Sequence, residues 1–266
     1  MTTASPTRFA ADWREWHAER ERALAAPLGW LSITRLEWLG PEPEQFDGIP
    51  GTWWFDGDTA YLRADDGDGI DPAGRREFRL HPTGPGELVT AGEKQIEVAR
   101  RGDGYLIRVH DPAGPVVAAF RGVPAFEPDE AWVLPARFEP YETPRSVTVG
   151  AVAEGLAHVY ESPGELVIER AGVEHRLIAF NGKGSGLSVL FTDGTSGVTT
   201  YAANRTLAVA VDDDVIARGG AVELDFNRAT NLPCAFIDFA TCPLPPAGNR
   251  LPFDVTAGEQ TPLERG

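Results

Sequence analysis

The sequence predicts a mainly β protein, with antiparallel sheets in a sandwich or barrel-like arrangement and one amphipathic helix at the N-terminus. From Gly51 onward, clusters of Gly, Pro and Asp separate short runs rich in Val, Ile, Leu and Phe, which is typical of many strands joined by turns. The dipeptide Asn181-Gly182 lies between two such runs and indicates a hairpin. This spacing differs from the alternating strands and helices of a dinucleotide-binding fold.

The N-terminal helix is predicted from about Pro6 to Ala26. Apolar residues recur there at helical spacing with charged residues between them, so one face can pack on a core. The apolar positions are Phe9, Trp13, Trp16 and Leu24. Pro27 and Gly29 end the helix, and the aromatic-rich segment 28–40 is expected to form a second short element packed on the core.

The predicted strands are short runs bounded by turn residues. They are Thr52–Phe55, Thr59–Arg63, Glu77–Leu80, Gln95–Ala99, Tyr105–His110, Val116–Arg121, Ser146–Ala153, Leu156–Tyr160, Glu165–Arg170, Val173–Phe180, Leu187–Phe191, Val198–Ala202, Leu207–Val211, Ala221–Phe226 and Cys234–Phe239. The proline-rich stretch Ala125–Pro144 is interpreted as a connector between two β regions. The predicted organisation is therefore a helical segment over 1–45, a β region over 46–125 and a second β region over 126–266, which could form one continuous domain.

The chain is acidic and has no long apolar run. Its 266 residues include 40 Asp and Glu against 24 Lys and Arg, for a formal net charge of -16. Such a charge repels phosphate backbones and anionic lipid surfaces, so neither nucleic acid nor membrane is expected as a partner. No segment resembles a secretory signal or a membrane span, and we predict a cytoplasmic location. The oligomeric state is left open.

Cys234 and Cys242 are the two cysteines of the chain. If the residues between them form an extended strand, about 26 Å separates the pair, far more than the ~4.4 to 6.8 Å between the Cα atoms of a disulfide. A disulfide would require a tight fold-back. A nucleophilic Cys234 would need a nearby base, and none is identifiable in the sequence.

Several motifs that suggest ligands have the wrong spacing. The aspartate-rich stretch 55–72 lacks the ligand order of a calcium loop and is interpreted as a turn. The glycine-rich stretch 180–188, which includes Lys183, lacks the spacing of a phosphate loop and is interpreted as a hairpin loop. Residues 191–197 lack the order of a nucleophile elbow. The five histidines show no metal-ligand spacing, so no metal is predicted and a cofactor is left unknown.

Strand alternation places polar side chains together in the C-terminal third. If Ala221–Phe226 is a strand, Asp225 shares one face with Glu223 and is followed on that side by Asn227. The same logic puts Cys234 on one face with Asp238. Upstream, the segment 200–205 is expected to place Tyr201 and Arg205 on one side of a strand. Such faces could line a pocket.

Three C-terminal blocks, TDGTSGVTTYAANR, LDFNRATNLPCAF and TCPLPPAGNRLPFDVTAGE, resemble the domain of unknown function family numbered 1684. The blocks GWLSITRLEWL at Gly29–Leu39 and YLIRVHDPAGPVVAAFRGVPAF at Tyr105–Phe126 resemble the same family, so the resemblance covers most of the chain. It implies no particular activity or cofactor. The positions that match the family motif are Asp193, Thr200, Tyr201, Arg205, Asp225, Asn227, Asn231, Cys234, Cys242, Asn249 and Glu259.

The first functional hypothesis is a small-molecule enzyme that uses carboxylate general acid–base chemistry. Its predicted catalytic residues are Tyr201, Asp225 and Asp238, and its predicted substrate-binding residues are Arg205, Asn227, Asn231 and Cys234. Arg205 would anchor an anionic or carbonyl group. The alternatives are a non-catalytic ligand-binding β-barrel, whose carboxylates would all be paired, and an interaction module with a broad exposed apolar patch. A buried polar network that only fixes loops would use the same residues.

Overall fold

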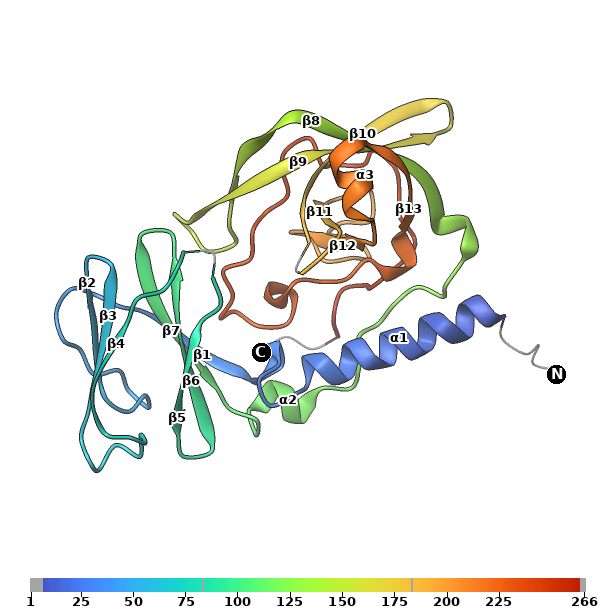
Figure 1. The fold of residues 1–266 in the computed structure, drawn as a ribbon. Helices are drawn as coiled ribbons and strands as arrows, with labels where there is room; N and C mark the ends of the chain where they lie inside the picture. The colour runs from blue at the N-terminus through green and yellow to red at the C-terminus, as the bar shows by residue number, and fades with distance from the viewer. Residues whose placement is uncertain (1–6, 83, 183, 264–266) are drawn as a thin grey trace, which may run out of the picture. The chain divides into compact units, whose positions relative to one another are not determined.

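Antiparallel strands dominate the computed structural model, which confirms the predicted mainly β fold and its N-terminal helix (Figure 1). The structure describes residues 7–82, 84–182 and 184–263. The helices are α1 (Arg8–Leu24), α2 (Pro115–Ala119) and α3 (Asp213–Arg218), with single turns of 3-10 helix η1 (Trp30–Ser32), η2 (Glu130–Trp132), η3 (Phe226–Arg228) and η4 (Pro233–Ala235). No described helix has the length and apolar character needed to span a membrane.

Most of the predicted strands are present with shifted bounds, whereas the strands Ile33–Trp38 and Glu87–Ala91 were not predicted. The strands are β1 (Ile33–Trp38), β2 (Thr52–Asp56), β3 (Thr59–Ala64), β4 (Gly74–Phe78), β5 (Glu87–Ala91), β6 (Lys94–Arg101), β7 (Gly104–His110), β8 (Val133–Gly150), β9 (Ala157–Arg170), β10 (Val173–Asn181), β11 (Leu187–Phe191), β12 (Arg205–Val209) and β13 (Gly220–Asp225). The chain divides into two compact units. The first comprises the described parts of residues 1–21, 121–236 and 241–265, and the second comprises those of 22–120 and 237–240.

The second unit contains two small antiparallel sheets, ordered β1-β7-β6-β5 and β2-β3-β4. Their apolar side chains form one core in which Trp53, Ile96 and Tyr105 are fully buried. The Tyr105 hydroxyl still has polar partners, because it donates to the Asp58 carbonyl at 2.7 Å and accepts from the Leu80 amide at 3.0 Å. A buried phenol placed in this way contributes its ring to the core without losing hydrogen bonds.

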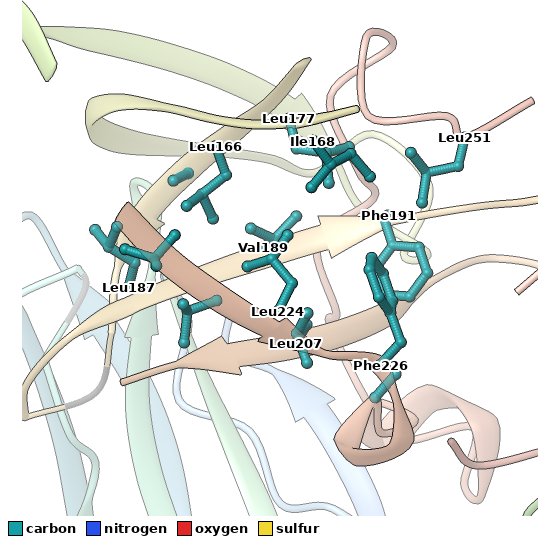
Figure 2. Packing of buried hydrophobic residues seen from close by; sticks show 14 of the residues in the cluster. Leu166, Ile168, Leu177, Leu187, Val189, Phe191, Leu207, Leu224, Phe226 and Leu251 are labelled. Carbon is teal, nitrogen blue, oxygen red and sulfur yellow. The ribbon is translucent and has the colours of Figure 1, made fainter. Parts of the chain in front are cut away.

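The first unit is built on a six-stranded antiparallel sheet ordered β12-β11-β10-β9-β8-β13. Its edge strands β12 and β13 lie near each other, so the sheet curls into a half-barrel. Buried side chains from both ends of the sheet and from the C-terminal segment meet inside it (Figure 2). They include Leu166, Ile168, Leu177, Leu187, Val189, Phe191, Leu207, Leu224, Phe226 and Leu251.

Strand β8 corrects the predicted connector over Ala125–Pro144, since it begins at Val133 and continues to Gly150. Prolines argued against a strand there because they cannot donate to a β ladder. The pairing explains why two of them are tolerated. β13 pairs with β8 only as far as Phe138, and the register with β9 is interrupted between Pro140 and Arg145. Pro140 and Pro144 therefore lie where β8 has a free edge and an irregular ladder.

The predicted strands Val116–Arg121 and Val198–Ala202 are wrong. Residues 116–121 begin within helix α2, because Pro115 occupies its first turn, where a missing amide hydrogen costs nothing. Residues 198–202 belong to a tight turn in which the Thr195 carbonyl accepts from the amides of Val198, Thr199 and Thr200. The side chain of Asp193 starts that turn by accepting from the Thr195 amide at 2.7 Å.

The turn predictions are confirmed. β10 and β11 form the hairpin that Asn181-Gly182 indicated, with residues 182–186 as its link, and Lys183 of that link lies outside the described residues. In the aspartate-rich stretch, the Asp65 amide donates to the Asp68 carboxylate at 2.8 Å, which is a local turn.

Candidate functional site

Buried asparagines fasten the irregular C-terminal segment to the half-barrel. Asn249 is fully buried, and its Nδ2 donates to the carbonyls of Ile178 at 2.9 Å and Leu190 at 2.8 Å. Its Oδ1 accepts from the Ile178 amide at 2.8 Å. Ile178 lies on β10 and Leu190 on β11, beyond the residues where these strands pair. The side chain therefore completes backbone hydrogen bonds where the ladder stops.

Asp225 and Asn227 lie together at the end of β13. Oδ1 of Asp225 accepts from the amide of Asn227 at 3.1 Å and from its Nδ2 at 2.9 Å. The second oxygen of Asp225 lies 3.3 Å from Nε of Arg228. Asn227 also exchanges two hydrogen bonds of 2.9 Å with the backbone of Asp129. These contacts cap η3 and hold residues that are far apart in sequence, while the catalytic role of Asp225 stays a prediction.

Arg205 lies in a buried network with Asp193, Thr195 and Thr200, here termed the Arg205 network. The Arg205 and Asp193 side chains have no exposed surface, and Nη2 of Arg205 lies 2.8 Å from the Asp193 carboxylate. The remaining Nη donors reach carbonyl oxygens of Val255, Ala257 and Glu259. Burial lowers the pKa of Arg205, and the Asp193 carboxylate opposes that shift. Both Nη atoms are therefore enclosed by protein acceptors, while Nε has no partner among the described residues.

A second polar cluster joins helix α1 to the C-terminal segment and consists of His17, Arg20, Asn231 and Glu259, here termed the Glu259 cluster. Nε of Arg20 lies 3.2 Å from Oε1 of Glu259, and the Asn231 amide donates to Oε2 at 2.6 Å. Arg20 also donates through Nη2 to the Asn231 carbonyl at 2.9 Å. The Glu259 side chain is 1% exposed and that of Arg20 is 23% exposed. Solvent therefore reaches part of the Arg20 guanidinium, whereas the Glu259 carboxylate is almost completely buried.

The local backbone explains how Glu259 reaches this place. The preceding Gly258 has φ +78°, and a Cβ there would lie 2.6 Å from the Ala229 carbonyl oxygen. Glycine is therefore needed both for the left-handed conformation and for the close approach. The Glu259 amide donates to the same carbonyl at 2.8 Å, so the residue after the glycine is fixed with its side chain directed toward α1.

The surroundings of the Glu259 carboxyl favour its protonated form. Burial raises the pKa of Glu259, and the Arg20 guanidinium, the Asn231 amide and His17 only partly offset the rise. Two buried polar atoms of the cluster, Nε2 of His17 and Oδ1 of Asn231, have no hydrogen-bond partner among the described residues. Trp13 stacks on the His17 ring with centroids 4.8 Å apart and fixes its orientation. Such groups can exchange a proton or accept a ligand.

The predicted strand Cys234–Phe239 is wrong, and the alternation that grouped Cys234 with Asp238 fails with it. Pro233 fixes the first residue of η4, and the chain then folds back. Asp238 is exposed, whereas Cys234 is buried. Tyr201 lies in a turn before β12, and its hydroxyl donates to the Cys234 carbonyl at 2.9 Å. Tyr201 and Cys234 thus lie together.

Among the predicted residues, Arg205 and Asn231 both contact Glu259, whereas Asp225 makes its hydrogen bonds with other residues. Arg20 and His17 were not predicted as site residues from the sequence. Their signal was weak, because a charged residue on an amphipathic helix usually faces solvent. No group of three or more His, Cys, Asp and Glu among the described residues is placed to hold a metal ion.

The fold and these contacts define a class of β protein in which buried polar side chains fasten a long irregular segment to a curled antiparallel sheet. The chain belongs to the family described as Protein of unknown function (DUF1684), whose model matches residues 118–260. No curated protein matches the chain. Among solved structures it is similar to an uncharacterized protein of Haloarcula marismortui determined by solution NMR, with 31% identity and a TM-score of 0.46 over 58% of this chain and 84% of that one.

Proposed function

We propose that this chain is a small-molecule enzyme in which the Glu259 carboxyl exchanges a proton with a substrate anchored by Arg20. The proposal rests on one observation, the Glu259 cluster. There a buried carboxylate and a partly exposed guanidinium form an ion pair beside two buried polar atoms that have no partner in the described part of the chain. A buried polar atom without a partner costs ~1 to 3 kcal/mol, and a ligand that hydrogen-bonds to it would offset that cost. The proposed reaction type is the carboxylate acid–base chemistry expected from the sequence, but the carboxylate is Glu259 instead of Asp225 or Asp238.

The donors and acceptors of the cluster define a class of ligand. Arg20 uses Nε and Nη2 within the protein, and Nη1 has no acceptor among the described residues, so it can donate to a carboxylate or carbonyl oxygen. Oδ1 of Asn231 requires a donor, such as a hydroxyl or amino group. We therefore expect a small carboxylic acid or carbonyl compound that also carries a hydroxyl or amino group.

The other predicted site residues have supporting places in this proposal. Arg205 positions Glu259 through its backbone carbonyl at 3.4 Å, and Asn231 contacts both Arg20 and Glu259. The roles of Tyr201, Asp225, Asp238, Asn227 and Cys234 stay predictions. So do the cytoplasmic location and the exclusion of nucleic acid and membrane as partners, which depend on the net charge of -16.

A thermal-shift screen tests the ligand class. Hydroxy acids, keto acids, amino acids and neutral carbonyl compounds are added singly to the full chain. A ligand at about 100 times its dissociation constant stabilises the folded state by ~2.7 kcal/mol. We expect a member of the panel to raise the melting temperature, and we expect Arg20→Gln to abolish that rise. Arg14→Gln is the matched control, because Arg14 lies on the same helix and its ion pair with Glu127 is at the surface.

Two results would contradict the site. One is a ligand-induced shift that survives in Arg20→Gln, and the other is its equal loss in Arg14→Gln. Each hit is also incubated with the protein and followed by NMR for product. Glu259→Gln keeps the side-chain volume, so it should retain the thermal shift while losing turnover. This separation assigns Glu259 to chemistry and not to binding.

A non-catalytic binding protein is the second candidate, and one observation favours it. Both oxygens of Glu259 already accept hydrogen bonds, from Arg20 and from the Asn231 amide, as the binding alternative predicts for its carboxylates. In that case hits bind in an Arg20-dependent manner, yet no product forms in the wild-type protein. An interaction module stays a further prediction, which would be supported by association with another protein through exposed apolar side chains.

A further inference from the structure

The two cysteines of the chain are neighbours in space. The amide of Cys234 donates to Sγ of Cys242 at 3.3 Å, and both residues are buried, with 2% and 6% exposure. One bond separates that amide nitrogen from Cα of Cys234, and two bonds separate the sulfur from Cα of Cys242, so the two Cα atoms are at most about 8 Å apart. The expected separation of about 26 Å fails because residues 234–242 fold back instead of forming an extended strand.

The backbone on each side of the pair is held by hydrogen bonds. The Cys242 carbonyl accepts from the Val152 amide at 2.9 Å, and the neighbouring Pro243 carbonyl accepts from Nδ2 of Asn204 at 2.6 Å. On the other side, the Cys234 carbonyl accepts from the Tyr201 hydroxyl at 2.9 Å. The upper bound of about 8 Å includes the ~4.4 to 6.8 Å separation of disulfide Cα atoms, and these hydrogen bonds hold the backbone beside both cysteines.

We propose that Cys234 and Cys242 form a site of reversible oxidative modification, at which a peroxide converts the buried thiol pair into an intramolecular disulfide. One thiolate attacks a peroxide oxygen and breaks the O–O bond, which gives a sulfenic acid and hydroxide. The second thiolate attacks the sulfenic sulfur and releases a second hydroxide. Protons from the two thiols convert both hydroxides to water, so the thiols lose two electrons in total and the peroxide gains them.

Burial makes the site selective for small oxidants. Hydrogen peroxide is close to water in size, so it can reach a buried sulfur. Glutathione disulfide is much larger and must place its own sulfur in line with a protein sulfur. The oxidised form would close residues 235–241 into a covalent loop, and thiols would reopen it. The inference concerns residues outside the Glu259 cluster and does not depend on the proposed function.

The test uses the full chain treated with hydrogen peroxide, quenched, and alkylated after unfolding without reductant. Since Cys234 and Cys242 are the two cysteines of the sequence, intact mass spectrometry assigns the product directly. We expect a species lighter than the reduced protein by two hydrogen atoms, resistant to alkylation, monomeric on non-reducing gels, and converted back by dithiothreitol. Digestion should yield one peptide pair, or one looped peptide, joined at these residues.

Other products would overturn the inference. One is a protein that still has two alkylatable thiols after a peroxide dose that oxidises a free thiol reagent. The others are a stable sulfinic acid on either cysteine and an intermolecular dimer. Cys242→Ser is the matched variant, since it keeps a polar acceptor for the Cys234 amide. We expect it to accumulate a sulfenic or sulfinic acid at Cys234 at peroxide doses that give the disulfide in the wild type. The wild-type mass decides the question even if this variant folds poorly.

Discussion

Asp193→Ala is expected to destabilise the first unit by about 3 to 5 kcal/mol, the usual cost of breaking a buried ion pair from one side. The variant leaves the guanidinium of Arg205 fully buried with carbonyl oxygens as its remaining partners. It also removes the acceptor for the Thr195 amide and so loosens the turn before β12. The measurement is urea-dependent hydrogen exchange resolved by peptide, which reads the protection of β11 and β12 separately from the second unit.

The double variant Asp193→Leu with Arg205→Met distinguishes a pairing requirement from a general intolerance of the site. Apolar residues in place of both charges often restore stability, so the double variant should be more stable than Asp193→Ala. Asp214→Ala is the surface control. Its ion pair with Arg218 has both side chains almost fully exposed, and its removal should change little. A double variant no more stable than Asp193→Ala would show that the charges do more than neutralise each other.

The parts of the fold that local chemistry determines could be predicted from the sequence. Helix α1 extends over Arg8–Leu24 against a prediction of about 6 to 26, because its aromatic spacing and the following Pro27 act within the segment itself. The hairpin at Asn181-Gly182 follows from turn chemistry in the same way. The adjacency of Asp225 and Asn227 was predicted from alternation at a strand end.

Features that depend on distant residues could not be predicted. β8 remains a strand at Pro140 and Pro144 because β13, from much later in the chain, pairs with β8 only as far as Phe138. The Cys234 segment folds back where a run of apolar residues suggested a strand, since a short apolar run does not distinguish the two. In the Glu259 cluster, Arg20 and Glu259 are 239 residues apart in sequence, so their ion pair has no local signal.

The roles of side chains in the C-terminal blocks likewise depend on residues that are distant in sequence. Asn249 in the sequence is an amide near glycine and proline, equally suited to a turn or a ligand. Only the positions of Ile178 and Leu190 show that it completes a sheet. Asn227 is similar, because its partner is the backbone of Asp129. A family motif rich in such residues therefore marks where a fold is fastened as readily as where a substrate binds.

In the second unit, we expect Glu97 to make folding stability depend on acid pH. Burial raises the pKa of Glu97, but hydrogen bonds and charge from His110 and Arg108 outweigh it and lower the pKa from 4.5 to about 2. Nη1 of Arg108 lies 3.0 Å from the carboxylate, and Nε2 of His110 lies 3.6 Å from it, an ion pair when the imidazole is protonated. The His110 ring is held from its other side by Ser32, 2.9 Å from Nδ1.

Because the folded pKa is depressed, the contribution of Glu97 is fully present above pH 4.5 and is lost as pH falls through about 2. A shift of this size corresponds to about 3 kcal/mol. Glu97→Gln should therefore lower the protection of β6 and β7 against hydrogen exchange near pH 6 and differ little from wild type near pH 2. Glu77→Gln is the control, because its ion pair with Arg75 is exposed. If Glu97→Gln lowers the protection of β6 and β7 equally at all pH values in this range, the loss is caused by packing and not by charge.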